Sequence, residues 1–167
     1  DVGFVEAQQH RPSPCYVFHD VDLLPENLGN IYGCTSQPRH LSVAVNTLRY
    51  QLLYPTLFGG ATALTARQFT RIGGFCNGFF GWGGEDDEIA LQLMRVGFSI
   101  TRLQPEWATY RMLEHRRQRD APDRNALIQH WEEEVAPIRD KDGLNGLRYT
   151  VQSREDRPLY SWLLVDL

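Results

Sequence analysis

Four consecutive acids, residues 85–88, follow a tryptophan set among three glycines in the stretch FGWGGEDDEIALQL, residues 80–93. The first turn of a helix accepts acids, because its unpaired N–H groups carry partial positive charge. Capping alone accounts for one or two of them, and it does not account for Trp82. The stretch therefore has two interpretations, a helix start and a reactive cluster.

A second pair of acids, Asp20 and Asp22, lies in HDVD at the end of an apolar run. In a strand, alternate residues point to the same face, so both carboxylates would share one side. Ligands usually bind at strand ends in α/β sheets. Two carboxylates there suit a hard divalent cation, which can also hold a diphosphate. The alternative is a pair of turn-capping aspartates, since DxD is common by chance.

Met112 and His115 lie three residues apart in RMLEH and share a face if the segment is helical or tightly turned. Histidine is a common metal ligand, whereas methionine is a soft and unusual partner for a hard ion. Taken alone, such a pair is ordinary core and surface.

Three cysteines, Cys15, Cys34 and Cys76, form no CxxC pair, which argues against a structural zinc site. Cys15 and Cys34 flank a strand-turn segment and could form a disulfide in an oxidising compartment. Buried free thiols are an equal alternative.

The elements that position these residues alternate along the chain. Apolar patterns predict a buried strand from Tyr16 to Leu24 closed by Pro25, and further strands in HLSVAVN, LFGGATALT, FSITRL, LRYTVQS and LYSWLLVDL. A first helix is predicted at 65–74, with Thr65 and Gln68 as a capping box and a glycine pair at its end. A second is predicted at 85–96, with a buried stripe of Ile89, Leu93, Met94 and Val96. A third is predicted at 122–135. Interleaved strands and helices indicate an α/β fold.

Composition sets wide limits on function. The 167 residues make about one domain, with 42% hydrophobic and 23% charged residues, as in ordinary globular proteins. A net charge of −4 weighs against a nucleic-acid binder. No apolar run approaches the ~20 residues that span a bilayer, and no signal peptide opens the chain. Because Asp1 is not a methionine, we expect a processed or truncated piece.

Taken in order, several segments closely resemble the β-1,4-galactosyltransferase family. They are CYVFHDVDLLPENLGNIYGCTSQPRHLSVAVN, LFGGATALT, GGFCNGFFGWGGEDDEIALQLMRVGFSITR, YRMLEH and DGLNGLRYTV. The resemblance covers essentially the whole chain, and GWGGEDD is a highly specific motif, unlike DxD.

The resemblance implies an inverting, manganese-dependent glycosyltransferase of the Golgi lumen with a GT-A-like α/β fold, a mixed sheet flanked by helices. Such enzymes move galactose or N-acetylgalactosamine (GalNAc) from a UDP-sugar to the 4-hydroxyl of a terminal N-acetylglucosamine (GlcNAc) acceptor. The expected partners are UDP-GalNAc or UDP-Gal and a GlcNAc-terminated glycan, with no nucleic acid. A membrane would be reached only through a segment absent from this chain, as in a type II membrane protein.

The same resemblance assigns roles to individual residues. It implies manganese ligands at Asp22, Met112 and His115, donor contacts at Asp20, Val21, Leu57, Gly60 and Trp82, and acceptor contacts at Gly84, Glu85, Asp86, Asp87 and Arg124, with Asp86 as the general base. It also implies a disulfide between Cys15 and Cys34 and leaves Cys76 as a buried free thiol. Trp82 matches a tryptophan on a small loop that closes over the donor. At the position of Leu57, relatives that transfer galactose have tyrosine, and relatives that transfer GalNAc have a smaller aliphatic residue.

The chain also departs from the family pattern. By this resemblance we expect residues 1–167 to be the C-terminal portion of the catalytic domain, without its N-terminal nucleotide-binding part. Asn125 stands where relatives often have an aromatic residue, which leaves the acceptor open. An incomplete or inactive domain that binds carbohydrate is therefore an alternative. A phosphoryl-transfer enzyme or hydrolase built on the DxD alone is disfavoured, because it would need no sugar-binding acids.

Overall fold

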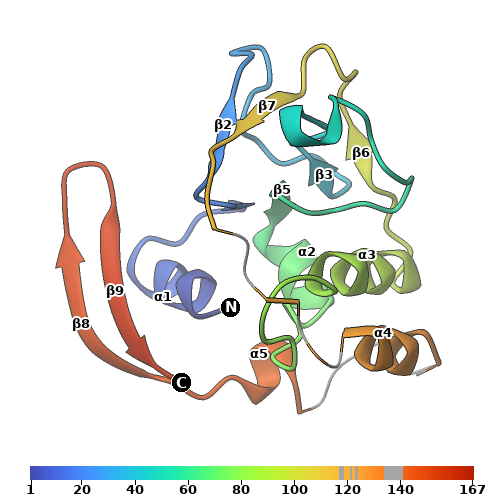
Figure 1. Ribbon diagram of the computed structural model, residues 1–167. Coiled ribbons are helices and arrows are strands. Elements are labelled where there is room, and N and C mark those ends of the chain that lie inside the picture. The colour runs from blue at the N-terminus through green and yellow to red at the C-terminus, as the bar shows by residue number, and fades with distance from the viewer. Residues whose placement is uncertain (117–118, 121, 123, 134–140) are drawn as a thin grey trace.

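The structure is a computed structural model and describes residues 1–116, 119–120, 122, 124–133 and 141–167. Within these residues, helices and strands interleave along the chain (Figure 1). The helices are α1 (Val2–His10), η1 (Asn46–Leu48), α2 (Ala66–Arg71), α3 (Glu85–Arg95), α4 (Arg124–Glu133) and α5 (Gly143–Gly146). The strands are β1 (Cys15–His19), β2 (Leu23–Pro25), β3 (Arg39–His40), β4 (Ala44–Val45), β5 (Ala61–Thr65), β6 (Thr101–Arg102), β7 (Thr109–Met112), β8 (Thr150–Asp156) and β9 (Ser161–Asp166).

The described strands form a mixed sheet, a smaller sheet and a hairpin. The mixed sheet has the order β1-β5-β3-β6, with β5 antiparallel to both neighbours and β3 parallel to β6. The smaller sheet has the order β2-β7-β4. The β8–β9 hairpin stands apart from both sheets, on the far side of α1 (Figure 1). The chain passes from the mixed sheet into the smaller one between β1 and β2, which is where the DxD acids lie.

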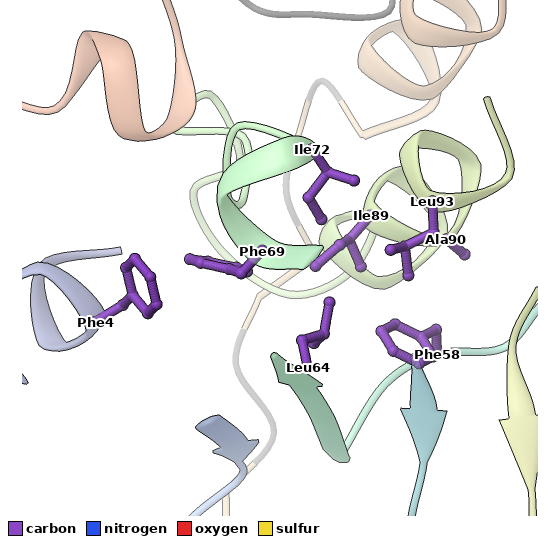
Figure 2. Close-up of a cluster of buried hydrophobic side chains, with 8 residues drawn as sticks. All are labelled: Phe4, Phe58, Leu64, Phe69, Ile72, Ile89, Ala90 and Leu93. Atoms are coloured by element: carbon purple, nitrogen blue, oxygen red, sulfur yellow. The ribbon is translucent and has the colours of Figure 1, made fainter. Parts of the chain in front are cut away.

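An apolar cluster fixes the helices to the mixed sheet. Its buried members come from α1, β5, α2 and α3 and from the residues before β5, and Figure 2 shows them gathered between these elements: Phe4, Phe58, Leu64, Phe69, Ile72, Ile89, Ala90 and Leu93. Burial of each large apolar side chain contributes roughly 1.5–3 kcal/mol. The apolar stripe of α3 therefore anchors that helix and fixes the position of its acidic first turn.

The predicted strand from Tyr16 to Leu24 was wrong as a single element. β1 ends at His19, the chain turns, and β2 begins at Leu23 in the other sheet, with Pro25 inside β2 rather than after it. The turn is held by the Asp20 N–H, which donates to the Gly60 carbonyl at 2.9 Å. β1 is half-buried rather than buried. Strand alternation therefore does not orient the two acids, because they lie in a turn.

Other predicted elements are shorter than their apolar patterns. HLSVAVN divides into β3 and β4, which belong to different sheets, and FSITRL contributes only the two residues of β6. Met94 was expected in the buried stripe of α3 but is 43% exposed. Helix α1 was not predicted, because its pattern is weak: it buries Phe4 beside Glu6, whose carboxylate accepts the Tyr149 hydroxyl at 2.7 Å.

Local capping signals predicted the helices well. Thr65 and Gln68 form the expected capping box of α2, and α3 begins at Glu85 as expected. The third predicted helix corresponds to α4 within the described residues, and its expected end at Val135 lies outside them.

The cysteines follow the family pattern. Cys15 and Cys34 form a disulfide that joins the start of β1 to the segment before β3, which confirms the expected bridge. Cys76 is buried and outside any disulfide. Among the described helices, none has the length and apolar character needed to cross a bilayer.

Candidate active site

The acidic first turn of α3 depends on a glycine. Gly84 is the N-cap residue and has φ +108°, a conformation that disfavours any side chain. A Cβ atom there would also meet the Phe79 ring at 2.5 Å. The helix can begin at this point only because the position carries no side chain, and all four residues that follow are acids. The unpaired N–H groups of a helix start commonly accommodate acids.

Asp86 lies against the backbone in front of β5. A Cβ atom on Gly59 would sit 2.0 Å from the Asp86 carboxylate, so only glycine allows this approach. Burial, followed by the charges of Glu85, Asp20 and Asp87, raises the pKa of Asp86 to about 7, and Arg124 opposes the rise. A carboxylate with such a pKa is suited to accept a proton near neutral pH.

Asp87 joins α3 to two neighbours. It accepts the Tyr54 hydroxyl at 2.7 Å, and its carboxylate lies 3.9 Å from the Arg124 guanidinium of α4. Burial and the bond to Asp87 raise the pKa of Tyr54. The Arg124 guanidinium also lies over the Trp82 ring, 5.4 Å from its centroid. The acceptor-side residues predicted from the sequence are therefore close together.

Two polar atoms in this cluster are buried and have no hydrogen-bond partner among the described residues. They are Oε2 of Glu85 and Nε of Arg124. An unsatisfied buried polar atom costs free energy, so it commonly marks a site that a ligand or water completes. One of the two atoms is an acceptor and the other is a donor, and both suit sugar hydroxyls.

The DxD turn lies beside the paired glycines and meets the end of β7. The Asp20 N–H bonds to the Gly60 carbonyl, and burial followed by the charges of Asp22 and Glu85 raises the pKa of Asp20. The Leu113 N–H donates to the Asp22 carbonyl at 2.7 Å. The turn thus links the acids to the residues after β7. Val21, at its tip, is 98% exposed.

His115 and Asp22 form a close pair, with Nε2 and Oδ2 2.9 Å apart. Met112 pairs with Leu23 in the β2–β7 ladder, one residue after Asp22, and its sulfur accepts the Thr47 hydroxyl at 3.6 Å. It ends a strand rather than sitting on a helix, so helical spacing does not explain its position near His115.

The Asp22 carboxylate and the His115 imidazole are thus in contact, and Met112 lies in the adjoining β2–β7 ladder. Among the described residues, no group of three or more His, Cys, Asp or Glu side chains could hold a metal ion. The Asp22–His115 pair could supply two ligands to a divalent cation, and the methionine sulfur would be a softer third. The carboxylate and the imidazole fit a divalent ion such as Mn²⁺, whereas a thioether would be an unusual further ligand for it.

Leu57 lies before β5, in no regular element, and is half-buried. Its N–H bonds to the Tyr54 carbonyl at 3.2 Å. Neither apolar cluster of the described residues includes Leu57. Leu57 is therefore neither a strand residue nor part of an apolar core cluster.

A hollow of about 520 Å³ opens beside the first turn of α3. It shares Glu85 with the acceptor-side cluster, and its other walls come mainly from the chain ends, the 75–81 segment and the residues after α5: Asp1, Phe75, Cys76, Asn77, Phe79, Phe80, Gly81, Gly146, Leu147, Arg148 and Leu167. The DxD turn does not line it. The hollow therefore adjoins the acceptor side of the cluster rather than the acid pair at Asp20 and Asp22.

Sequence reasoning missed Tyr54, and it gave Gly59 no role beyond marking, with Gly60, a place where another group could approach the backbone closely. Tyr54 lies 33 residues from its partner Asp87, and no local pattern links them. The available signal was the glycine pair itself, since adjacent glycines mark places where another group approaches the backbone closely.

Comparison with known proteins identifies the family. Two family models match: one described as the N-terminal region of glycosyl transferase group 7, over residues 1–35, and one described as the N-terminal domain of galactosyltransferase, over residues 39–116. The chain is 42% identical to β-1,4-galactosyltransferase 1 of Homo sapiens over 170 residues, which is 100% of this chain and 42% of the relative. The chain belongs to the β-1,4-galactosyltransferase family.

Other relatives agree. β-1,4-Galactosyltransferase 4 of Rattus norvegicus is 39% identical over 99% of this chain and 48% of its own length. The chain thus spans about half the length of the curated relatives that it matches.

A solved structure shares the fold. The catalytic domain of Drosophila β1,4-galactosyltransferase 7, in complex with xylobiose, superposes with a TM-score of 0.77 at 23% identity, over 98% of this chain and 71% of that one. The GT-A-like mixed α/β fold expected from the sequence is confirmed.

Proposed function

We propose that this chain is the C-terminal portion of the catalytic domain of an inverting, metal-dependent hexosyltransferase. It moves GalNAc or galactose from a UDP-sugar to the 4-hydroxyl of a terminal GlcNAc-type acceptor, forming a β linkage. The observation that carries the proposal is the environment of Asp86, whose carboxylate is buried against Gly59 and has a pKa raised to about 7. Homology to β-1,4-galactosyltransferases over the whole chain supports the reaction class.

Inversion needs one base that takes the proton of the attacking hydroxyl. Asp86 has the raised proton affinity for this role, and Gly59 leaves no room for a water shell on one side of its carboxylate. Glu85 Oε2 accepts, and Arg124 Nε donates, in bonds to the acceptor sugar. Asp87 is held by Tyr54 and completes the acceptor contacts.

The donor side is the DxD turn with Gly60 and Trp82. Asp22, His115 and Met112 would hold Mn²⁺, which offsets the charge that develops on the departing diphosphate. A solved Drosophila relative with 21% identity is a complex with manganese, UDP-Gal and xylobiose, which supports this cofactor and donor class. Asp20 and the exposed Val21 lie on the same turn, next to the Gly60 carbonyl, as donor contacts require.

Leu57 sets the choice of donor. A tyrosine at this position would crowd the C2 substituent of the sugar, whereas leucine leaves an apolar recess for an acetamido methyl. The half-buried position of Leu57, outside both apolar clusters, supports a contact with ligand. We therefore propose GalNAc transfer at least as efficient as galactose transfer.

By homology with the family, we also propose that the protein acts in the Golgi lumen. The alternative is an incomplete domain that binds a carbohydrate without turnover. The unpartnered Glu85 and Arg124 atoms fit that function equally well, so turnover decides between the two.

The test is a donor screen scored by release of UDP. The 167-residue chain, alone and fused to the N-terminal half of a family relative, is incubated with Mn²⁺, a GlcNAc acceptor and either UDP-GalNAc or UDP-Gal. We expect acceptor-dependent release with UDP-GalNAc, and a shift toward UDP-Gal of roughly 10- to 200-fold in Leu57→Tyr. Arg67→Lys, an exposed change in α2, is the matched control. Binding of GlcNAc without release from either donor would favour the carbohydrate-binding alternative.

A further inference from the structure

The segment from Pro55 to Ala61 carries Leu57 and both glycines, yet only its last residue belongs to a strand. Three polar side chains form hydrogen bonds with its backbone: His40, Ser42 and Arg102. We refer to these three as the bracket. His40 and Arg102 are direct neighbours in the parallel β3–β6 pair, so the mixed sheet itself places them together.

Arg102 forms hydrogen bonds with the first part of the segment. One terminal nitrogen of its guanidinium donates to the Pro55 carbonyl at 2.8 Å and to the Leu57 carbonyl at 2.6 Å. Its Nε donates to Nδ1 of His40 at 3.2 Å. Because arginine can only donate, the imidazole must accept at Nδ1 and carry its hydrogen on Nε2.

His40, oriented by Arg102, forms a hydrogen bond with the first of the two glycines. Its Nε2–H donates to the Gly59 carbonyl at 3.0 Å, and its side chain is 1% exposed. Burial and the neighbouring Arg102 charge lower the pKa of His40 to about 3, so the ring stays neutral at working pH. The imidazole therefore keeps one tautomer and one set of bonds.

Ser42, the third residue of the bracket, forms hydrogen bonds on both sides of Gly60. Its hydroxyl donates to the Gly59 carbonyl at 3.0 Å and accepts the Ala61 N–H at 2.8 Å. The Gly60 carbonyl between them accepts the Asp20 N–H at 2.9 Å. The bracket thus reaches the DxD turn through a single peptide unit.

We propose that Arg102, His40 and Ser42 are positioning residues that fix the backbone from Pro55 to Ala61 and thereby make the recess at Leu57 selective for one donor sugar. They touch no substrate and act only through the carbonyls they hold. The proposal has two parts. The selectivity part, the effect on donor choice, rests on the proposed function, whereas the mechanical part, the fixing of the backbone from Pro55 to Ala61, is independent of it.

The mechanical part is tested by amide hydrogen exchange in the 167-residue chain, without ligand. Arg102→Lys keeps the charge, but an ammonium cannot donate to His40 and to both carbonyls in the same fixed fork. We expect faster exchange of the Asp20 and Ala61 amides by about tenfold, the effect of losing roughly one net hydrogen bond. Amides of α2 and the control Arg67→Lys should stay unchanged. Unchanged exchange at both amides in Arg102→Lys would overturn the proposal.

The selectivity part is tested by the ratio of kcat/KM for UDP-GalNAc and UDP-Gal in the fused enzyme. Both donors are assayed on one preparation, so the ratio does not depend on the fraction that is folded. The ratio is measured in two backgrounds, one with Leu57 and one with Leu57→Tyr. In each background, adding Arg102→Lys or His40→Leu should move the ratio toward one. His40→Gln, whose amide can still donate to the Gly59 carbonyl, should recover most of the selectivity.

The outcomes separate the two claims. No turnover with either donor in the unmodified fusion contradicts the proposed function, and hydrogen exchange still decides the mechanical part. Normal turnover with the same ratio in all bracket variants contradicts the selectivity part alone.

Discussion

At the residue scale, the site is defined by carboxylates whose surroundings differ. Asp86 is buried against Gly59 among other acids, whereas Asp22 pairs with His115 at 2.9 Å. Similar side chains therefore have different tasks. The pKa of Asp86 is raised to about 7, and Asp22 is the carboxylate that we propose as a metal ligand.

The first prediction concerns Asp86→Asn. The amide keeps the shape and the contact with Gly59 but cannot accept a proton, so kcat should fall by about 10²- to 10⁴-fold while donor affinity stays unchanged. Steady-state kinetics of the fused enzyme, with UDP-sugar binding measured by calorimetry, would check this. Turnover within a few-fold of the unmodified enzyme would remove Asp86 as the base.

The second prediction is a stability change with pH. An aspartate titrates near 3.8 when unfolded, and Asp86 titrates at about 7 when folded. Between these values the folded state binds the extra proton, so this contribution to stability is complete below about pH 4 and is lost as pH rises through about 7. At pH 8, the free energy of unfolding of Asp86→Asn, measured by urea titration, should therefore exceed that of the unmodified chain by up to about 4 kcal/mol.

The control for this measurement is Asp166→Asn, an exposed change in β9. It should leave the dependence of unfolding on pH unaltered. If Asp86→Asn also leaves it unaltered, the folded pKa of Asp86 is not raised.

At the element scale, short strands carry the site, and their connections are secured by covalent and polar links. The Cys15–Cys34 disulfide ties the start of β1 to the segment before β3, across 19 residues. β1 leads directly into the DxD turn, and β3 carries His40 of the bracket. The cross-link thus stabilises the two segments that lead to the donor side.

The third prediction follows from this cross-link. Replacing both cysteines by serine should lower the free energy of unfolding by about 3 kcal/mol, because a loop of this length is no longer closed in the unfolded chain. Urea titration measures the change. Cys76→Ala, which removes one buried sulfur and no cross-link, should cost about 1 kcal/mol. Equal losses in the two variants would contradict a role for the disulfide beyond side-chain packing.

The sequence predicted those elements whose signals are local. The capping box of Thr65 and Gln68 and the acid-rich start of α3 define helix ends within a few residues, and the structure has both. The break after His19 was missed because an apolar run continues through it. β1 ends at a tight turn in which the Leu23 N–H donates to the Asp20 carbonyl at 3.2 Å, and β2 then pairs with β7, almost 90 residues later in the chain. Such pairing leaves no local pattern.

At the scale of the whole molecule, two structural units meet at the site. The mixed sheet with α2 and α3 presents the acceptor-side acids, and the smaller sheet presents Met112 and the residues that follow it (Figure 1). The family resemblance located these residues in the sequence. Tyr54 and the bracket were not predicted, because their partners lie tens of residues away.

The central claim is transfer with inversion by a single base, and the product reports it most directly. The fused enzyme is given Mn²⁺, UDP-GalNAc and a GlcNAc acceptor, and the disaccharide is analysed by proton NMR for anomeric configuration and linkage position. We predict a β linkage to the 4-hydroxyl, with no such product from Asp86→Asn. An α linkage, attachment at another hydroxyl, or equal product from Asp86→Asn would contradict the account.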